Sequence, residues 1–342
     1  MNLADLNKVA LAMVAPGKGI LAADESTGTI KKRFDAINVP STEETRRDYR
    51  EMLFRCSEAM SRHISGVILY DETIWQNAKD GTPLVKIIEQ SGAIPGIKVD
   101  EGTQPLPECP GELVTVGLDK LAERLKKYYE RGARFAKWRA VIDIGGQSIP
   151  SMTAIHVNAH ALARYAALCQ AAQIVPIVEP EVLMDGDHDI DRCYEVTQRV
   201  LNKTFQELRI QRVALEGMIL KPNMAVAGKK SGKPASVEEV AEKTVRMLKA
   251  CVPAAVPGIA FLSGGQSDEE ATAHLDAMNR LGGLPWHLTF SYGRALQAAP
   301  QKAWSGKAEN VAAGQRAFAH RARMNSLATS GEWKADLEKK AA

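Results

Sequence analysis

Short apolar runs recur along the chain and alternate with longer amphipathic stretches. Most of the runs are apolar at successive positions rather than at every second position, which is typical of strands buried on both faces of a parallel sheet. In the run 135–142 the basic residues Lys137 and Arg139 alternate with apolar ones. Each run is bounded by glycine, proline or charged residues, which mark the turns at its ends. The runs expected to form strands, some with the turn that follows, are residues 17–24, 66–70, 94–100, 135–142, 174–181, 218–220, 258–265 and 286–294.

The stretches between these runs show the three- and four-residue spacing of helices that bury one face. Capping-box spacing begins the stretches at Thr42 and Ser236. Residues 25–29 are polar and are expected to form a loop. The expected helices are residues 3–14, a charged helix that begins at Thr42, residues 118–132, 151–172, 189–212, 236–250 and 268–280, and most of the chain after residue 294.

Strand and helix alternate about eight times, which predicts an α/β fold with a closed (β/α)8 TIM barrel. A doubly wound parallel sheet is the alternative. No low-complexity linker interrupts the pattern, so residues 1–342 are expected to form one domain. An extra N-terminal helix precedes the first strand, and a charged tail from about residue 331 to 342 follows the last helix.

Composition narrows the class of protein. The 342 residues are 45% hydrophobic and 25% charged, as in ordinary globular proteins. A net charge of +3 does not suggest nucleic acid or membrane partners, and no apolar run approaches the ~20 residues of a membrane helix. The N-terminus does not resemble a signal peptide. The five cysteines are scattered and lack a CxxC motif, which favours reduced thiols and a cytoplasmic protein.

Charged residues end many of the expected strands, where the active sites of such barrels lie. Lys221 is the most informative, because it closes the apolar run 218–220 and Pro222 ends that strand. Alone, such a lysine either extends to solvent or acts as a desolvated, nucleophilic amine that forms a Schiff base. Crowding of cations and carboxylates shifts pKa values and favours the second interpretation. The residues at strand ends are Asp24, Lys98, Lys137, Glu179, Lys221, Ser263 and Arg294.

Two turns near the end of the chain could bind phosphate. Residues 263–267 and 291–294 follow the last two expected strands and combine glycine with serine or arginine. Backbone N–H groups at such turns suit an anion, although glycine is common in any strand-to-helix turn. A second anion site is suggested by Ser26, Thr29, Lys32, Arg33 and Lys98, which could otherwise be a solvated helix start.

Three other motifs are interpreted as structural. Residues 228–233 are one residue short of a P-loop, and proline replaces its Ser/Thr. His156 and His160 share one helix face without an evident third ligand, so surface histidines are expected. The stretch that begins with residues 185–189 lacks the sixth-position glycine and the terminal glutamate of a calcium loop, and residues 185–189 are interpreted as a loop and helix cap. No metal site and no cofactor are therefore expected.

At the strand ends and turns the sequence closely resembles the class I (Schiff-base) fructose-bisphosphate aldolases. The matching stretches follow the order of the family and span almost the whole chain, which makes them more specific than any one motif. They are GKGILAADESTG (17–28), GIKVD (96–100), FAKWR (135–139), VPIVEPE (175–181), DGDHD (185–189), LEGMILKPNM (215–224), FLSGGQS (261–267) and LTFSYGRALQ (288–297).

The resemblance implies a (β/α)8 barrel and reversible retro-aldol cleavage of fructose 1,6-bisphosphate into glycerone phosphate and glyceraldehyde 3-phosphate, in glycolysis and gluconeogenesis. It also implies catalysis without metal and, commonly, a homotetramer. Lys221 matches the lysine that forms the Schiff base, and Glu179 matches the acid/base of carbinolamine dehydration. Asp24 matches the carboxylate that removes the C4 hydroxyl proton, and Lys137 matches the lysine near the cleaved bond. Glu181 and Arg139 match supporting positions.

The resemblance also assigns the two phosphate ends of the substrate. Ser26 and Lys98 match groups toward the second phosphate, and Arg33 matches a substrate-binding arginine. The residues that match the site of the ketose phosphate end are Ser263, Gly264, Gly265, Ser291, Gly293 and Arg294.

The chemistry of an imine fits this assignment independently. A protonated imine accepts the electron pair left by C–C cleavage and becomes a neutral enamine, so no metal is needed. Two alternatives stay open. One is a Schiff-base aldolase for a related ketose phosphate, such as fructose 1-phosphate or a seven-carbon bisphosphate. The other is a scaffold that binds acidic polymers through Lys229–Lys233.

The C-terminus departs from the family pattern. Many members end in a tyrosine that reaches the site and helps to move the enamine proton, whereas the last tyrosine here is Tyr292. We expect another group, such as Glu179 acting through water, to handle that proton. Removal of the last six residues should then leave activity nearly unchanged.

Overall fold

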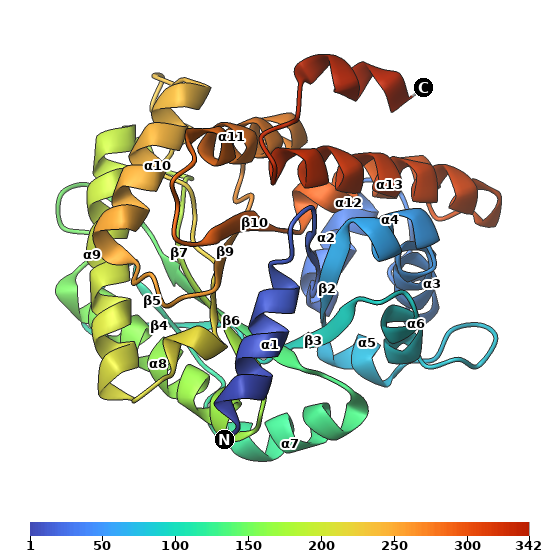
Figure 1. The fold of residues 1–342 in the computed structure, drawn as a ribbon, viewed down its shortest axis with the longest axis horizontal. Helices are drawn as coiled ribbons and strands as arrows, with labels where there is room; N and C mark the ends of the chain where they lie inside the picture. Colours follow the sequence, from blue (N-terminus) through green and yellow to red (C-terminus); the bar gives the residue numbers. More distant parts are fainter. Residues whose placement is uncertain (342) are drawn as a thin grey trace.

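Eight parallel strands close into a barrel in the computed structural model, which describes residues 1–341 (Figure 1). Around the barrel the order is β1-β10-β9-β8-β7-β6-β3-β2. This closure confirms the predicted (β/α)8 TIM barrel and excludes the doubly wound sheet. The barrel strands are β1 (Gly19–Ala23), β2 (Ile64–Leu69), β3 (Ile94–Lys98), β6 (Phe135–Ile142), β7 (Val175–Val182), β8 (Ile219–Leu220), β9 (Gly258–Phe261) and β10 (His287–Tyr292).

The interior of the barrel is filled from the strands and closed at one end by the N-terminal helix α1 (Leu3–Met13). Leu6 and Met13 of α1 belong to the same buried cluster as Phe135 and Ile219 of the strands. The Phe135 ring fills the space beside Gly96, where a Cβ atom would overlap the ring. The extra helix predicted from the sequence therefore covers the amino ends of the strands (Figure 1).

Helices surround the barrel and pack on it through a second, larger apolar cluster (Figure 1). In that cluster the Trp138 ring of β6 stacks on the Tyr165 ring of α8, with centroids 5.6 Å apart. The helices are α2 (Thr27–Asp35), α3 (Glu43–Phe54), α4 (Ser57–Arg62), α5 (Asp71–Trp75), α6 (Leu84–Gln90), α7 (Leu121–Arg131), α8 (Met152–Ala171), α9 (Ile190–Ile210), α10 (Val237–Cys251), α11 (Asp268–Leu281), α12 (Arg294–Trp304) and α13 (Val311–Ala328).

Two segments outside the predicted strands and helices contain regular structure. Helix α2 already begins at Thr27, because the Ser26 hydroxyl caps it by accepting the Thr29 amide at 3.3 Å. The expected loop at residues 25–29 was thus wrong beyond Ser26; threonine and glycine are weak helix formers and hid this start. The proline-rich segment after β3 holds an antiparallel hairpin of β4 (Thr103–Pro105) and β5 (Leu113–Thr115).

The charged C-terminal tail is folded onto the protein rather than extended. The 3-10 helix η3 (Ala335–Ala341) brings Glu338 to helix α13. The Glu338 carboxylate accepts hydrogen bonds from Arg321 Nη1 at 2.5 Å and Trp333 Nε1 at 2.9 Å. The Arg321 side chain is only 5% exposed, so the tail neutralises a buried cation.

Candidate active site

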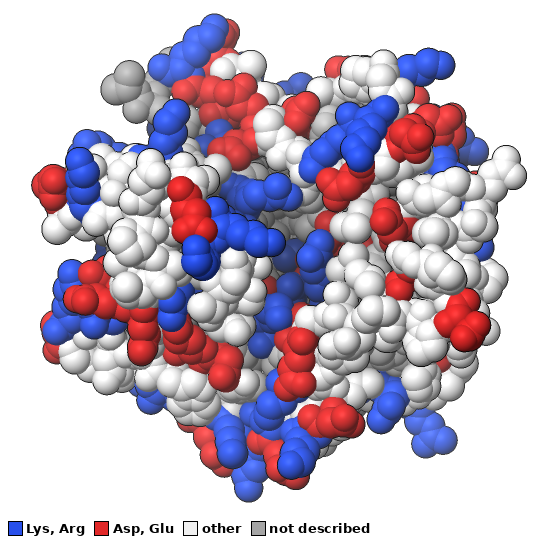
Figure 2. Space-filling view, turned by 180° about the vertical axis from the view of Figure 1, so that it is seen from behind, with Lys and Arg blue, Asp and Glu red and all other residues white. Residues whose placement is uncertain are grey.

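The site predicted from the strand ends lies at the open end of the barrel. A cavity of about 960 Å³ occurs there, and residues from β1, β3 and β6 and from the loops after β1, β3 and β7 line it. Seen from the side opposite to Figure 1, lysine and arginine side chains line the hollow in this face (Figure 2). The cavity is therefore suited to an anionic ligand.

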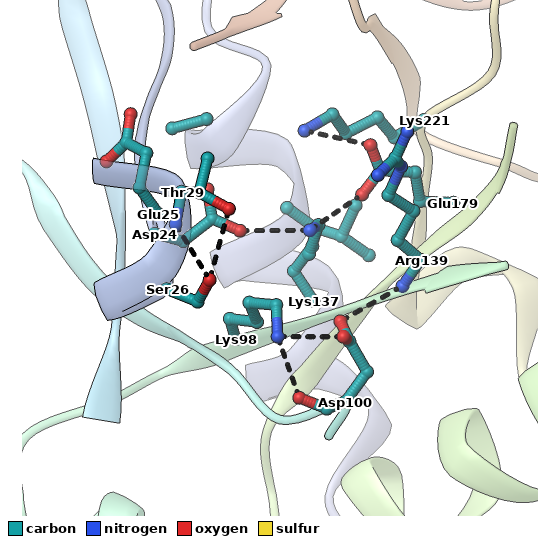
Figure 3. A network of polar contacts seen from close by, with 12 residues as sticks. Asp24, Glu25, Ser26, Thr29, Lys98, Asp100, Lys137, Arg139, Glu179 and Lys221 are labelled. Atoms are coloured by element: carbon teal, nitrogen blue, oxygen red, sulfur yellow. Dashed lines mark hydrogen bonds and ion pairs between the residues drawn. The ribbon is translucent and has the colours of Figure 1, made fainter. Parts of the chain in front are cut away.

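Four charged side chains from four strands form a chain of ion pairs across this end of the barrel (Figure 3). Lys137 Nζ lies 2.9 Å from Asp24 Oδ2 and 3.2 Å from Glu179 Oε2. Glu179 Oε1 lies 3.2 Å from Lys221 Nζ. Lys137, Glu179 and Lys221 are each at most 4% exposed. The barrel thus brings an amine, two carboxylates and a second cation into one buried cluster, as predicted from the sequence.

Neighbouring charges dominate the protonation of this cluster. Burial alone would raise the pKa of Asp24, but the charges of Lys137 and Lys221 outweigh it and hold that pKa well below its ordinary value. Burial alone would lower the pKa of Lys137, but Asp24 and Glu179 hold it well above its ordinary value. Asp24 is therefore an ionised base and Lys137 a permanent cation at neutral pH.

A second group of charges borders the first on strands β3, β6 and β7. The Arg139 guanidinium donates to the Glu181 carboxylate. Lys98 Nζ lies 2.8 Å from Asp100 Oδ1, and the Arg139 amide donates to Asp100 Oδ2 at 3.3 Å (Figure 3). Asp100 was not among the predicted site residues, although it follows Lys98 closely in the matching GIKVD stretch.

Ser26 also lines the cavity, at the start of α2. Its hydroxyl is 3.1 Å from the Thr29 hydroxyl, and both residues line the same cavity as Lys98 (Figure 3). The start of α2 and the end of β3, which carry Ser26, Thr29 and Lys98 of the suggested second anion site, therefore meet at one cavity.

The turns after β9 and β10 present donors that lack strong acceptors. The Gly265 amide donates only to the Met184 sulfur, at 3.1 Å, and sulfur is a weak acceptor. The Ser291 hydroxyl is buried and has no hydrogen-bond partner among residues 1–341. Arg294 joins the two turns by donating to the Gly264 carbonyl. Such unsatisfied donors beside an arginine suit a bound phosphate.

The other predicted members of this phosphate site lie close by. Ser263 is buried and lies two residues after the end of β9, and Gly264, which follows it, has φ +57°. The Arg33 guanidinium lies next to Gly293. The structure thus supports one site for the Gly-rich turns and Arg33, although they are distant in the sequence.

A buried network behind Arg33 was missed from the sequence. The Glu25 carboxylate accepts from Arg33 and from Gln297 Nε2, the latter at 2.7 Å. Arg50, only 1% exposed, donates to the Glu25 carbonyl at 2.9 Å. Residues 25–29 were interpreted as a loop, so the sequence did not indicate that Glu25 is buried. The signal that could have indicated it is its position next to Asp24.

Two of the three motifs interpreted as structural, residues 185–189 and the pair of histidines, have structural contacts. Asp189 caps α9 by accepting the Arg192 amide at 2.8 Å. His156 and His160 face Glu207, with Nδ1–carboxylate distances of 3.4 and 3.1 Å. Within residues 1–341, no group of three or more His, Cys, Asp or Glu side chains is arranged to hold a metal ion.

No helix in that same part of the chain is long and apolar enough to cross a membrane.

Comparison with known proteins agrees with this geometry. The family model for class-I fructose-bisphosphate aldolase, a glycolytic family, matches residues 5–342. A probable fructose-bisphosphate aldolase class 1 of Xanthomonas campestris is 58% identical over 98% of this chain and all of its own length. The cytosolic fructose-bisphosphate aldolase 4 of Arabidopsis thaliana is 56% identical over 94% of this chain and 82% of its own.

A solved structure agrees as well. The fructose-bisphosphate aldolase of Plasmodium falciparum, crystallised with TRAP and a small-molecule inhibitor, superposes with a TM-score of 0.95. The two sequences are 49% identical, and the match covers 97% of this chain and 96% of the Plasmodium chain. The chain therefore belongs to the class-I fructose-bisphosphate aldolase family, whose Schiff-base cleavage of fructose 1,6-bisphosphate into glycerone phosphate and glyceraldehyde 3-phosphate it catalyses.

Proposed function

We propose that Lys221 is the amine that attacks the ketone carbon of fructose 1,6-bisphosphate. The supporting observation is the buried ion-pair chain from Asp24 through Lys137 and Glu179 to Lys221. Glu179, 3.2 Å from the Lys221 amine, accepts a proton from the attacking nitrogen and returns it to the carbinolamine hydroxyl, which leaves as water. The product of these steps is a protonated imine between Lys221 and the ketone carbon.

The cleavage step uses Asp24, at the end of the ion-pair chain opposite to Lys221. Asp24, kept ionised by Lys137, accepts the proton of the C4 hydroxyl while the C3–C4 bond breaks. The electron pair of that bond moves to C3 and into the imine, which becomes an enamine, and the aldehyde half leaves. Lys137 stabilises negative charge that develops near the broken bond. Glu181 and Arg139 support this arrangement, since their pair flanks Glu179 on β7 and β6.

The two phosphates are assigned to opposite parts of the cavity. The ketose phosphate binds at the turns after β9 and β10, where its ligands are Ser263, Gly264, Gly265, Ser291, Gly293 and Arg294, with Arg33 beside them. The second phosphate binds near Ser26 and Lys98, which both line the cavity. This arrangement holds the C3–C4 bond over the charged chain.

Borohydride trapping tests the assignment of Lys221. The protein is incubated with fructose 1,6-bisphosphate, reduced with borohydride, and mapped by mass spectrometry. We expect one reduced adduct, on Lys221. An adduct on Lys137 instead would reverse the roles of the two buried lysines. Parallel cleavage assays with fructose 1-phosphate and a seven-carbon bisphosphate rank the related ketose substrates, which share the imine route.

We also propose that the enamine is protonated without help from the C-terminus, by Glu179 through a water molecule. A test of this proposal must distinguish a loss of catalysis from a loss of stability, because Glu338 in the tail neutralises the buried Arg321. Deleting the last six residues should leave kcat nearly unchanged but lower the free energy of unfolding by about 1–3 kcal/mol, through the lost partner of Arg321. Deleting only residues 339–342 keeps Glu338 and should change neither. A large fall in kcat for the shorter deletion would contradict the proposal.

The assembly and location of the protein are inferred from its family. We infer that residues 1–342 act as one domain, that four such chains form a homotetramer, and that the protein works in the cytoplasm. The cytosolic Arabidopsis relative and the five free thiols support the location. Sedimentation of the purified protein tests the assembly, since a tetramer would have four times the 37.2 kDa mass of the chain.

A further inference from the structure

Lys229 lies beside the Gly-rich turn proposed as the ketose phosphate site, although it follows β8 and belongs to residues 228–233, which were interpreted as structural. A Cβ atom on Gly265 would overlap the Cε and Nζ atoms of Lys229. The ammonium therefore lies against the backbone of the turn whose amide donates only to sulfur. Its partner is Asp185, on the loop after β7, with Nζ 2.9 Å from Oδ1. Asp185 also lines the active-site cavity.

The backbone around Lys229 is fixed even though its side chain is exposed. The Lys229 amide donates to the Met184 carbonyl at 2.8 Å, and the Gly228 amide donates to the His188 carbonyl at 2.8 Å. A side chain at Gly228 would overlap the Gly186 carbonyl, so the two loops can approach this closely only at a glycine. The position of Lys229 over the phosphate turn is thus built by the fold.

Lys229 can readily exchange its partner Asp185 for a phosphate. Their side chains are 40% and 62% exposed, and ion pairs of that kind contribute little to stability. A phosphate at the turn would offer oxygens with more negative charge than one carboxylate, and it could also accept from the Ser291 hydroxyl and from the Gly265 amide, which donates to sulfur in its absence. The ammonium can therefore leave Asp185 for a phosphate at small cost.

We propose that Lys229 is an additional ligand of the ketose phosphate, held by Asp185 until the phosphate arrives. This proposal rests on the assignment of the ketose phosphate to this turn and deepens it. Lys229 strengthens binding of substrates phosphorylated at that end and takes no part in the bond-breaking steps. Asp185 weakens binding because it competes with the phosphate for the same ammonium.

The test compares Lys229→Met with Lys230→Met, which removes the same charge from an exposed neighbour on the same loop. Inorganic phosphate is the probe, as a competitive inhibitor of fructose 1,6-bisphosphate cleavage. Loss of one charge-assisted contact should raise the phosphate Ki and the KM about tenfold in Lys229→Met, with kcat within about twofold. Lys230→Met should change each constant by less than about twofold. Equal effects of the two variants would overturn the proposal, because Lys229 would then act only as surface charge.

Asp185→Asn tests the exchange itself. It should lower the phosphate Ki in the wild-type background and do so less in the Lys229→Met background. The same decrease in both backgrounds would show that Asp185 only repels phosphate, and would overturn the exchange. Phosphorus NMR titration with inorganic phosphate compares all variants without turnover. An active enzyme with no selective effect at Lys229 refutes this proposal alone, whereas an inactive wild type refutes the reaction.

Discussion

Replacement of Lys221 by methionine should reduce cleavage of fructose 1,6-bisphosphate by about 10⁴-fold or more, because the variant cannot form the imine. The fold should survive, since methionine has a similar length and Glu179 keeps Lys137 at 3.2 Å as an ionic partner. The steady-state rate of triose phosphate formation is the measurement. Borohydride should leave no adduct on the variant, which links the lost rate to the lost amine.

Two controls make this result specific. Lys302→Met removes an exposed lysine of α12 and should keep full activity. Circular dichroism of Lys221→Met should match the wild type, which excludes unfolding as the cause. Activity within tenfold of the wild type would contradict the role of Lys221. If that remaining activity were lost with a chelator, the reaction would use a metal instead of an imine.

The core of the site could be predicted because topology, rather than long-range packing, brings it together. In a parallel barrel all strands end at the same edge, so residues that end buried runs must converge there. Lys221 follows β8 directly, whereas Lys137 and Glu179 lie inside the longer strands β6 and β7, at the level where the shorter strands β3 and β8 end. The structure joins the three with distances of 3.2 Å. The apolar runs were readable for the same reason, since strands buried on both faces contain few polar residues.

The parts that were missed depend on contacts between segments far apart in the sequence. Glu25 is bound by Gln297, 272 positions away, and Lys229 by Asp185, 44 positions away. No local period signals such a pair. Helix α2 was missed for a different reason: it begins with Thr27-Gly28-Thr29, residues of weak helix propensity, and depends on the Ser26 cap. The residues of the buried ion-pair chain could thus be predicted from the sequence, but the network that supports Arg33 could not.

Replacement of Lys137 by methionine should lower both activity and stability. Lys137 separates two buried carboxylates, and removing it leaves Asp24 without its 2.9 Å partner. Breaking a buried pair in this way should lower the free energy of unfolding by about 3 kcal/mol. Cleavage should fall by about 10²–10³-fold, because the charge that develops near the broken bond loses its stabilising cation. Urea unfolding and steady-state kinetics measure the two effects, with Lys302→Met as the matched control.

The pH dependence of this stability loss identifies its cause. The pKa of Asp24 is lowered in the folded state, so its contribution is complete above the ordinary value of 3.8 and is lost as pH falls through the folded value. The pKa of Lys137 is raised, so its contribution is complete below 10.5 and is lost as pH rises through the folded value. The difference between wild type and Lys137→Met should therefore stay constant between about pH 5 and 9. A difference that changed steeply within that range would mean that another group pairs with Lys137.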